Sequence, residues 1–423
     1  MDHDIRQMLR DRADDVAPSF PTLPTTTLSR ARRSRVSTVV ASAMTVAVLL
    51  AGSVAIADRL RHGGRSINPT ARFVKSKLSL VLPEEPRDVA YGAGALWVAS
   101  NHSLFELDPT NGRIRKSWPF PLSGYPRPPY VQKTIAVTRS AVWVVLAADG
   151  VKRTEVAPVQ TRSCDSQGHC HAGMSLSVGE GPKPKNFKDW WALFRVDFKT
   201  GKAFLGVKSY TSDVGSISAG PTGVWVGATE SSNPFKGSFY RFDGTTGHLL
   251  AQIEAGGSPM SMSATSNRVL AVVQTRDNPN FVALIDPLRK RVSSPIYIHD
   301  AQTIAEIGGN AWILEHSQSS KALLIRLSLP SLRVTGEQRI PFDPVDFGFA
   351  AVTSADGPIW VSGGFPVHFA LIDPSTLRVA SAEGDGVAEH AVATPYGLWA
   401  VEPSPGQHNL HLFTVSDVVD AQR

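Results

Sequence analysis

The stretch 94–112 reads GALWVASNHSLFELDPTNG and contains two features that recur through the chain. The first is an apolar residue followed by Trp and Val after a Gly-containing turn, here Leu96-Trp97-Val98. The second is an apolar strand that ends in Asp and a turn, here Asp108-Pro109. Asp and Pro begin such turns because the Asp carboxylate bonds nearby backbone N–H groups and Pro pre-sets φ. The stretch therefore predicts two neighbouring strands and the turn that follows them.

The Trp feature occurs six times, and a seventh copy has Leu270 in place of Trp. Neighbouring copies are 39–48 residues apart, except for one interval of 82 that an insertion explains. The six Trp positions are Trp97, Trp143, Trp225, Trp312, Trp360 and Trp399. The Asp turn recurs at Asp197, Asp243, Asp286 and Asp373, with weaker copies at Ser328-Leu329-Pro330 and Ser416-Asp417. A fixed period of this length is typical of repeat architectures.

A third pattern lies eight residues before each Trp-equivalent position, where every copy has an apolar residue. These residues are Val89, Ile135, Ile217, Met262, Ile304, Val352 and Ala391. The next residue along is mostly small, as in Ala90 or Ser218. Each repeat therefore predicts a strand with small residues, the Trp strand, a strand that ends at Asp, and a last strand such as 249–254. Four strands in about 40–45 residues make one propeller blade.

The ends of the chain complement each other. The seventh repeat ends near 415–423 without room for a fourth strand, whereas the segment Lys77–Leu82 before the first repeat matches a fourth strand. Pairing the two removes an open sheet edge. We therefore predict an all-β fold, a seven-bladed β-propeller of four-stranded blades over residues 72–423, whose N-terminal strand closes the last blade. A pair of β-sandwiches is the alternative, but it would not show seven-fold periodicity.

Composition and charge narrow the class of protein. The 423 residues are 42% apolar and 19% charged, which excludes general disorder and a disulfide-rich mini-scaffold. The net charge of +6 comes from residues 1–35 and 58–81, and residues 82–423 carry about −1. A nucleic-acid-binding domain would instead spread its positive charge over the folded part. Nucleic acid is therefore not an expected partner.

Residues 36–57, VSTVVASAMTVAVLLAGSVAIA, are uncharged and have arginines on both sides. As a helix they would extend roughly 33 Å, about the thickness of a bilayer core. We expect a cytoplasmic arm over 1–35, a transmembrane helix over 36–57, a linker over 58–71 and the propeller outside the cell membrane. The alternative is a signal peptide cleaved after Ala57, because Ala55-Ile56-Ala57 has the small-x-small form of a cleavage site. Both alternatives place the propeller outside the cytoplasm.

The segments 94–98 and 104–112 resemble the YVTN and streptogramin-lyase-like β-propeller superfamily. The arm and apolar span resemble leader segments of uncharacterised bacterial single-pass membrane proteins. The first resemblance implies a possible enzyme, because streptogramin lyases use a metal-assisted His and Glu on one face. Here only Glu315 and Glu402 follow a Trp by three residues, and His316 and His390 are present. The flanking residues differ from the Trp-Phe-Thr-Glu runs of that family, so no catalytic motif is carried over.

Innermost strands line the axis of a propeller, so polar residues on them are the first candidates for binding. The repeat pattern places Asp88, Glu306, Glu389 and His390 on those strands. They could bind a cation or a polar ligand, or they could be solvated residues at strand ends. No Gly-rich phosphate loop, HExxH or EF-hand motif is present, so neither a cofactor nor a metal is expected.

The second repeat contains an insertion at about 150–189, in which Cys164 and Cys170 flank a short polar loop. Outside the cytoplasm a disulfide between these two cysteines is expected. Zinc bound with His169 and His171 is the alternative, although the spacing is not a standard one. The expected function is non-catalytic binding of a protein, peptide or envelope glycan, and the alternative is a lyase or hydrolase with a metal-assisted site.

Overall fold

The computed structural model describes residues 73–420 with gaps. The gaps are 122–129, 149–152, 155–158, 165–169, 176–178, 181–189, 210–213, 231–232, 266–267, 277–278, 293–294, 316–321, 330, 343–349, 356, 364–367, 385–389 and 403–408. The predicted arm, transmembrane helix and linker lie outside the described residues. Within the described part, no helix is long and apolar enough to cross a membrane.

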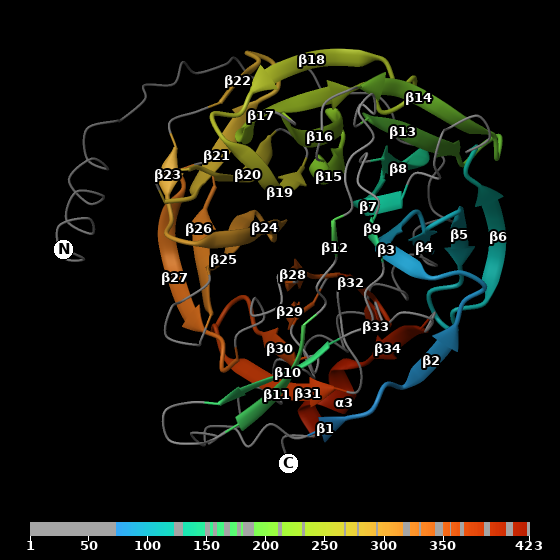
Figure 1. Cartoon of the computed structure of the whole chain (residues 1–423). Helices are drawn as coiled ribbons and strands as arrows, with labels where there is room; N and C mark the ends of the chain where they lie inside the picture. Colours follow the sequence, from blue (N-terminus) through green and yellow to red (C-terminus); the bar gives the residue numbers. More distant parts are fainter. Residues whose placement is uncertain are drawn as a thin grey trace, which may run out of the picture. The chain divides into compact units, whose positions relative to one another are not determined.

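Seven antiparallel sheets follow one another along the chain, and each corresponds to one predicted repeat (Figure 1). Blade 1 contains β3 (Pro86–Gly92), β4 (Ala95–Ser100), β5 (Ser103–Leu107) and β6 (Ile114–Pro119), and blade 2 contains β7 (Tyr130–Val137), β8 (Ala141–Ala148), β13 (Trp190–Asp197) and β14 (Ala203–Ser209). Blade 3 contains β15 (Val214–Gly220), β16 (Gly223–Glu230), β17 (Asn233–Phe242) and β18 (Leu249–Glu254). Blade 4 contains β19 (Ser258–Ala264), β20 (Val269–Gln274) and β21 (Phe281–Asp286), with β22 (Arg291–Val292) and β23 (Ile296–Tyr297) sharing the outer position.

Blade 5 contains β24 (Ala301–Ile307), β25 (Asn310–Glu315), β26 (Leu323–Ser328) and β27 (Arg333–Arg339). Blade 6 contains β28 (Ala350–Thr353), β29 (Ile359–Gly363), β30 (His368–Ile372) and β31 (Val379–Gly384). Blade 7 contains β32 (His390–Thr394), β33 (Gly397–Val401), β34 (Asn409–Phe413) and β2 (Leu78–Val81). The insertion in blade 2 contains β9 (Arg153–Thr154), β10 (Val159–Cys164), β11 (Cys170–Ser175) and β12 (Gly179–Glu180).

The ring closes as the sequence predicted. The innermost strands contact one another in the order β3, β7, β15, β19, β24, β28 and β32, and β32 contacts β3 (Figure 1). In blade 7, β2 pairs antiparallel with β34, with Leu78 opposite Leu412 and Val81 opposite Asn409. The N-terminal strand is therefore the fourth strand of the last blade.

The small residues on the inner strands are explained by their pairing with the Trp positions. In all seven blades the small-residue column lies directly opposite the Trp column. The pairs are Ala90 with Trp97, Ala136 with Trp143, Ser218 with Trp225, Ser263 with Leu270, Ala305 with Trp312, Thr353 with Trp360 and Val392 with Trp399. Directly paired residues share one face of a sheet, so a small partner leaves room for an indole.

Each Trp packs toward the following blade, and this forms one apolar core between each pair of neighbours. Trp225 of blade 3 lies in a core with Met262 and Val269 of blade 4. Trp399 of blade 7 lies with Val89 and Leu96 of blade 1, so the closing interface is built like the others. Burying these large side chains is the main driving force for assembling the ring.

Backbone N–H groups on the edges of inner strands donate hydrogen bonds to hydroxyls of the preceding blade. The hydroxyl of Ser218 accepts the Ala264 N–H at 2.8 Å, and that of Ser263 accepts the Glu306 N–H at 2.9 Å. Thr353 accepts the Ala393 N–H at 3.1 Å in the same way. These bonds satisfy backbone donors that an edge strand would otherwise leave unpaired.

Both ends of the described chain add contacts that the sequence analysis did not predict. The two-residue strand β1 (Phe73–Val74) pairs parallel with β31 of blade 6. Ser416-Asp417, predicted as a weak copy of the Asp turn, instead lies in helix α3 (Val415–Asp420). That prediction was wrong because Thr414 caps the helix: its N–H donates to the Asp417 carboxylate at 2.9 Å, and its hydroxyl accepts the Asp417 N–H.

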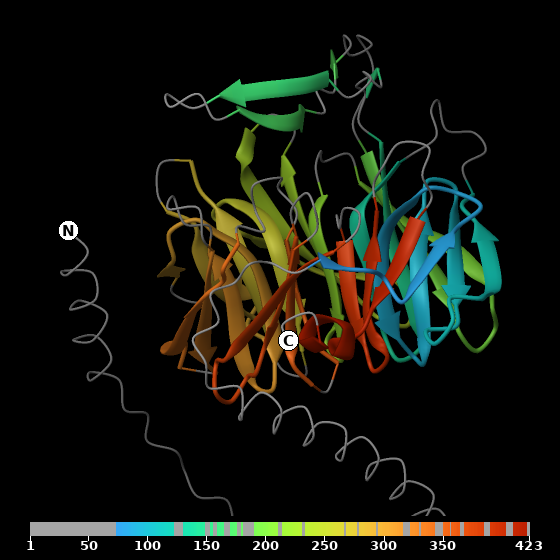
Figure 2. The ribbon, with the colours of Figure 1, turned by 90° about the horizontal axis from the view of Figure 1, so that it is seen from below.

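Strand direction divides the ring into two faces. Connections between the first and second strands and between the third and fourth strands lie at one end of the blades, which we call the turn face. Connections between the second and third strands and between successive blades lie at the other end, which we call the insertion face, since the insertion joins β8 to β13 there. Figure 2 shows the ring from the side, with α3 at the lower, turn-face edge.

Candidate functional site

Asp88 and His390, which the sequence predicted to line the axis, meet where the ring closes. Nδ1 of His390 lies 3.4 Å from Oδ1 of Asp88, and each side chain is only 13% exposed. The Asp88 carboxylate also accepts the backbone N–H of Ile135 at 2.9 Å and that of Val89 at 2.8 Å. Asp88 therefore links blades 7, 1 and 2 near the insertion face. These contacts give the pair a structural role in closure in addition to its place beside the axis.

Glu306 lies at the other end of the inner strands. It is the sixth residue of β24, whereas Asp88 is the third residue of β3. Three residues correspond to roughly 10 Å along a strand, so Glu306 lies near the turn face. Its carboxylate accepts a hydrogen bond from the Thr265 hydroxyl at 2.6 Å. The structure thus brings Asp88 and His390 together but not Glu306, and Glu389 is outside the described residues.

Glu315 is a partly buried carboxyl group on the insertion face. It ends β25, and burial raises its pKa to about 7. The field of His299 opposes this rise, and the charges of Asp300 and Glu337 add to it. Nδ1 of His299 lies 2.8 Å from Oδ2 of Asp300. A carboxyl group that exchanges its proton near neutral pH is suited to proton transfer or to binding a cationic group.

Glu402, the second Glu that follows a Trp by three residues, belongs to a buried polar chain in blade 7. Its Oε2 atom accepts Nδ2–H of Asn409 at 2.7 Å and lies 3.1 Å from Nε2 of His411. Nδ1 of His411 lies 3.3 Å from the Ser76 hydroxyl. His411 is 7% exposed and its ring lies beside Phe413. This chain joins the segment before β2 to the last blade.

Sequence reasoning missed the partners of Glu402. Asn409 and His411 alternate with leucines in the strand NLHLF, and polar residues at alternate positions of an otherwise buried strand were the available signal. Ser76 carries no local signal, because its contact with His411 joins residues 335 positions apart. Such a contact depends on ring closure.

Glu84 lies between β2 of blade 7 and β3 of blade 1, and its carboxylate contacts residues of blade 1. Burial acts to raise its pKa, but hydrogen bonds from the Ser100 and Ser103 hydroxyls outweigh that effect and the pKa is lowered. The Ser103 hydroxyl donates to Oε1 at 2.7 Å and the His102 N–H donates to Oε2 at 3.1 Å. Glu84 therefore remains ionised on the insertion face at neutral pH.

In the insertion, the backbone pairing of β10 with β11 sets Cys164 directly opposite Cys170. The disulfide remains a prediction, to which the pairing of the two backbones adds support. Among the described residues, no group of three or more His, Cys, Asp or Glu side chains is arranged to hold a metal ion. On the described part of the insertion face, imidazoles instead lie beside single carboxylates, as in Asp88–His390 and Asp300–His299.

Comparison with known proteins identifies the fold and nothing finer. No protein-family model matches the chain, and no curated protein matches it in sequence. Among solved structures, one of the mitotic checkpoint complex covers 83% of this chain and 95% of its own, at 10% identity and a TM-score of 0.52. One of Kuenenia stuttgartiensis hydrazine synthase covers 84% and 99%, at 11% identity and a TM-score of 0.49. Both neighbours are β-propeller proteins. The seven sheets of the ring show this fold in the chain itself, and the likeness to the mitotic checkpoint complex structure agrees with it.

Proposed function

We propose that the chain is a membrane-anchored, extracytoplasmic interaction module that binds a protein, peptide or envelope-glycan ligand on the insertion face. The observed β-propeller fold supports binding in general, because propellers commonly serve as interaction modules. The anchor rests on the uncharged segment 36–57 and its flanking arginines.

The contrast between the two faces carries the choice of the insertion face. The turn-face connections are short and held by their own hydrogen bonds: the Asp243 carboxylate, for example, accepts the N–H groups of Thr245 and Thr246. The longer connections, including 149–189, leave from the insertion face. Long connections on a rigid scaffold are where binding residues concentrate.

Several carboxylates lie on this face, beside the exposed basic residues Lys236, Arg276 and Arg339. Glu84 is held ionised, Glu315 shares its surroundings with Asp300 and Glu337, and Glu254 is exposed at the end of β18. A peptide or protein segment rich in Lys or Arg would find complementary charge there.

The insertion can be removed without disturbing the blade. Ala148 and Trp190 are directly paired, so Asn-Gly in place of 149–189 would form a two-residue hairpin between β8 and β13. The matched control replaces 364–367 with Asn-Gly between Gly363 and His368, which are paired in the same way in blade 6. Both changes shorten a connection between second and third strands.

The test is chemical crosslinking of the full chain in native membranes, followed by capture and identification of the attached partners. We expect the 149–189 replacement to lose a partner that the wild type and the 364–367 control retain. All three should keep the same melting temperature and should stay in the membrane pellet after carbonate extraction. Retention of the same partner by both variants would contradict a ligand site at the insertion, and release by carbonate would contradict the anchor.

Glu315 supports a second candidate, a lyase or hydrolase, because its pKa of about 7 suits general acid–base chemistry. Metal analysis of the purified full chain separates the two candidates. A divalent metal bound in stoichiometric amount and lost in Glu315→Gln would favour the enzyme.

A further inference from the structure

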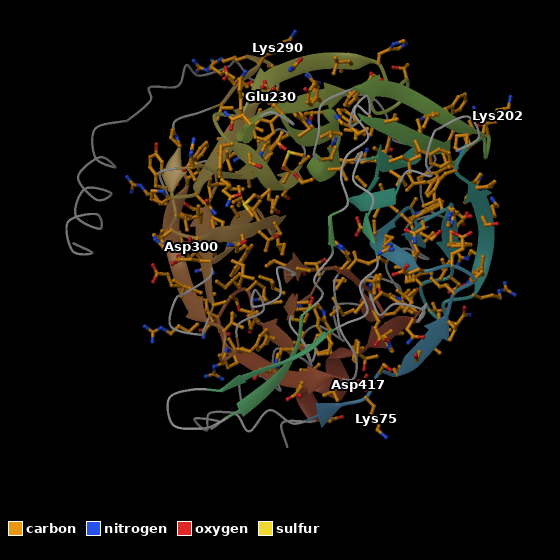
Figure 3. All side chains as sticks on the ribbon, viewed as in Figure 1. Lys75, Lys202, Glu230, Lys290, Asp300 and Asp417 are labelled. Atoms are coloured by element: carbon orange, nitrogen blue, oxygen red, sulfur yellow. The ribbon has the colours of Figure 1, made fainter. Side chains whose placement is uncertain are left out.

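The turn face carries a basic residue at the same position of six blades. It lies five residues after the Asp, or its Ser equivalent, that begins each turn between third and fourth strands. The six residues are Arg113, Lys202, His248, Arg291, Arg333 and Arg378, and all are exposed. Lys199, Arg289 and Lys290 add positive charge in the same turns of blades 2 and 4. Figure 3 shows Lys202 and Lys290 at the outer edge of the ring.

The acidic residues of these turns are directed inward. The carboxylate of Asp286 accepts the backbone N–H groups of Leu288 and Arg289, each at 2.9 Å. Hydrogen bonds from the Thr246 and Thr245 N–H groups lower the pKa of Asp243, so that it stays ionised inside its turn. The Asp carboxylates of these turns therefore bond to the turn backbone, and Oδ2 of Asp286 also lies 3.7 Å from Nε of Arg289, while the basic residues of the turns are exposed.

Apolar side chains are exposed beside the basic ones. Leu288, between Pro287 and Arg289, is 86% exposed. Ile114, Leu249 and Val334 each follow one of the six basic residues directly and are also exposed. Tyr396, in the turn between the first two strands of blade 7, is 48% exposed. Exposed apolar residues scattered singly need no explanation, but here they repeat with the basic position from blade to blade.

We propose that the turn face of the ring rests on the surface of a bilayer that contains anionic lipids. This proposal rests on the proposed membrane anchor. Lys and Arg side chains attract anionic headgroups, each strengthening the interaction roughly fivefold at the surface. Apolar side chains between them enter the boundary between headgroups and acyl chains. A soluble polyanion would engage the basic residues but would leave Leu288 and Val334 in water, so a lipid surface accounts for both features.

The tether permits this orientation. From Ala57 at the end of the predicted span to Phe73 at the start of β1 there are 15 intervening residues. An extended chain of that length reaches about 50 Å, so the ring can lie on the bilayer with either face. The exposed basic and apolar residues of the turn face favour contact of that face with the bilayer. The insertion face then points away from the membrane and is available to the ligand.

The test compares the full chain in lipid nanodiscs of neutral phosphatidylcholine with discs that also contain anionic phosphatidylglycerol. A water-soluble, amine-reactive reagent labels lysines, and mass spectrometry measures the extent at each site. Lys199 and Lys290 report on the turn face, and Lys236, near the insertion-face end of β17, is the internal control. We expect anionic lipid to lower labelling of the two reporters roughly threefold and high salt to restore it, while labelling of Lys236 stays constant.

Two double variants with equal charge change sharpen the test. Lys202→Glu with Arg291→Glu alters the turn face, and Arg276→Glu with Arg339→Glu alters exposed residues toward the insertion face of blades 4 and 5. Anionic lipid should fail to protect Lys199 and Lys290 from labelling only in the Lys202→Glu, Arg291→Glu variant. Protection of Lys236 alone, or unchanged labelling of Lys199 and Lys290, would overturn the proposal. So would protection by heparin that equals protection by anionic lipid. A chain that does not co-elute with the discs would instead refute the anchor itself.

Discussion

The sharpest energetic prediction concerns Glu315, because its raised pKa makes the stability of the ring depend on pH. The pKa rises from 4.5 to about 7, mainly through burial. A raised pKa means that the folded state binds the proton more tightly than the unfolded state. The contribution to stability is therefore fully present below about pH 4.5, decreases as the pH rises, and is lost above about pH 7.

The magnitude follows from the shift. One pKa unit corresponds to about 1.4 kcal/mol, so this shift sets an upper limit of about 3 kcal/mol. The side chain is partly accessible to water, which screens part of that energy, and we expect about 1–2 kcal/mol. Glu315→Gln removes the ionisable group and keeps the shape. At pH 8 the variant should therefore be more stable than the wild type by about 1–2 kcal/mol, and at pH 4.5 the two should be nearly equal.

The assay is thermal unfolding of the full chain in detergent at half-unit steps from pH 4.5 to 8. The difference in melting temperature between Glu315→Gln and wild type should grow steadily over that range and level off above pH 7. Glu254→Gln is the matched control, because it makes the same substitution at an exposed strand end and should change stability by less than about 0.5 kcal/mol. A constant difference across the whole range would refute a proton bound at Glu315.

Three further predictions test the ring and its insertion. Ser263→Ala removes the hydroxyl that accepts the Glu306 N–H and should cost about 1 kcal/mol by thermal unfolding, whereas the exposed Ser331→Ala should cost less than half of that. Trp225→Leu, at a fully buried position opposite Ser218, should cost about 2–4 kcal/mol, although Leu is native at the equivalent position 270, whose partners are shaped for it. Thiol titration should find no free thiol on Cys164 and Cys170 before reduction and two after it; two free thiols without reduction would exclude the disulfide.

The fold was predictable because the constraint that closes a propeller is repeated in the sequence. Val89 pairs with Val98, and Ile304 pairs with Ile313, as spacing relative to Trp97 and Trp312 requires. In most blades the large Trp side chain lies opposite a small residue of the inner strand, so the two columns of residues recur together. Their seven-fold recurrence therefore indicated both the pairing and the number of blades.

The candidate site was predictable only in part. Asp88 lies nine residues before its Trp and Glu306 lies six before its own, so simple counting would have placed the two carboxylates at different depths along the axis. The contact between His390 and Asp88 depends on closure, and the sequence predicted that closure but not the contact. The pKa of Glu315 depends on burial among several neighbours, which no local pattern encodes.

Because the ring closes through strands from opposite ends of the chain, it cannot close until the last strand has been made. The strand β2 is made before all seven inner strands, yet its partner β34 is the last strand of the chain. Contacts between residues so far apart in sequence form late, because the entropy of closing the loop must be overcome first. Until then β2 lacks its partner strand. The Asp88–His390 pair forms only when blade 7 meets blade 1, and the Ser76–His411 contact forms only when the N-terminal segment joins blade 7. These polar groups therefore stabilise the step that completes the ring.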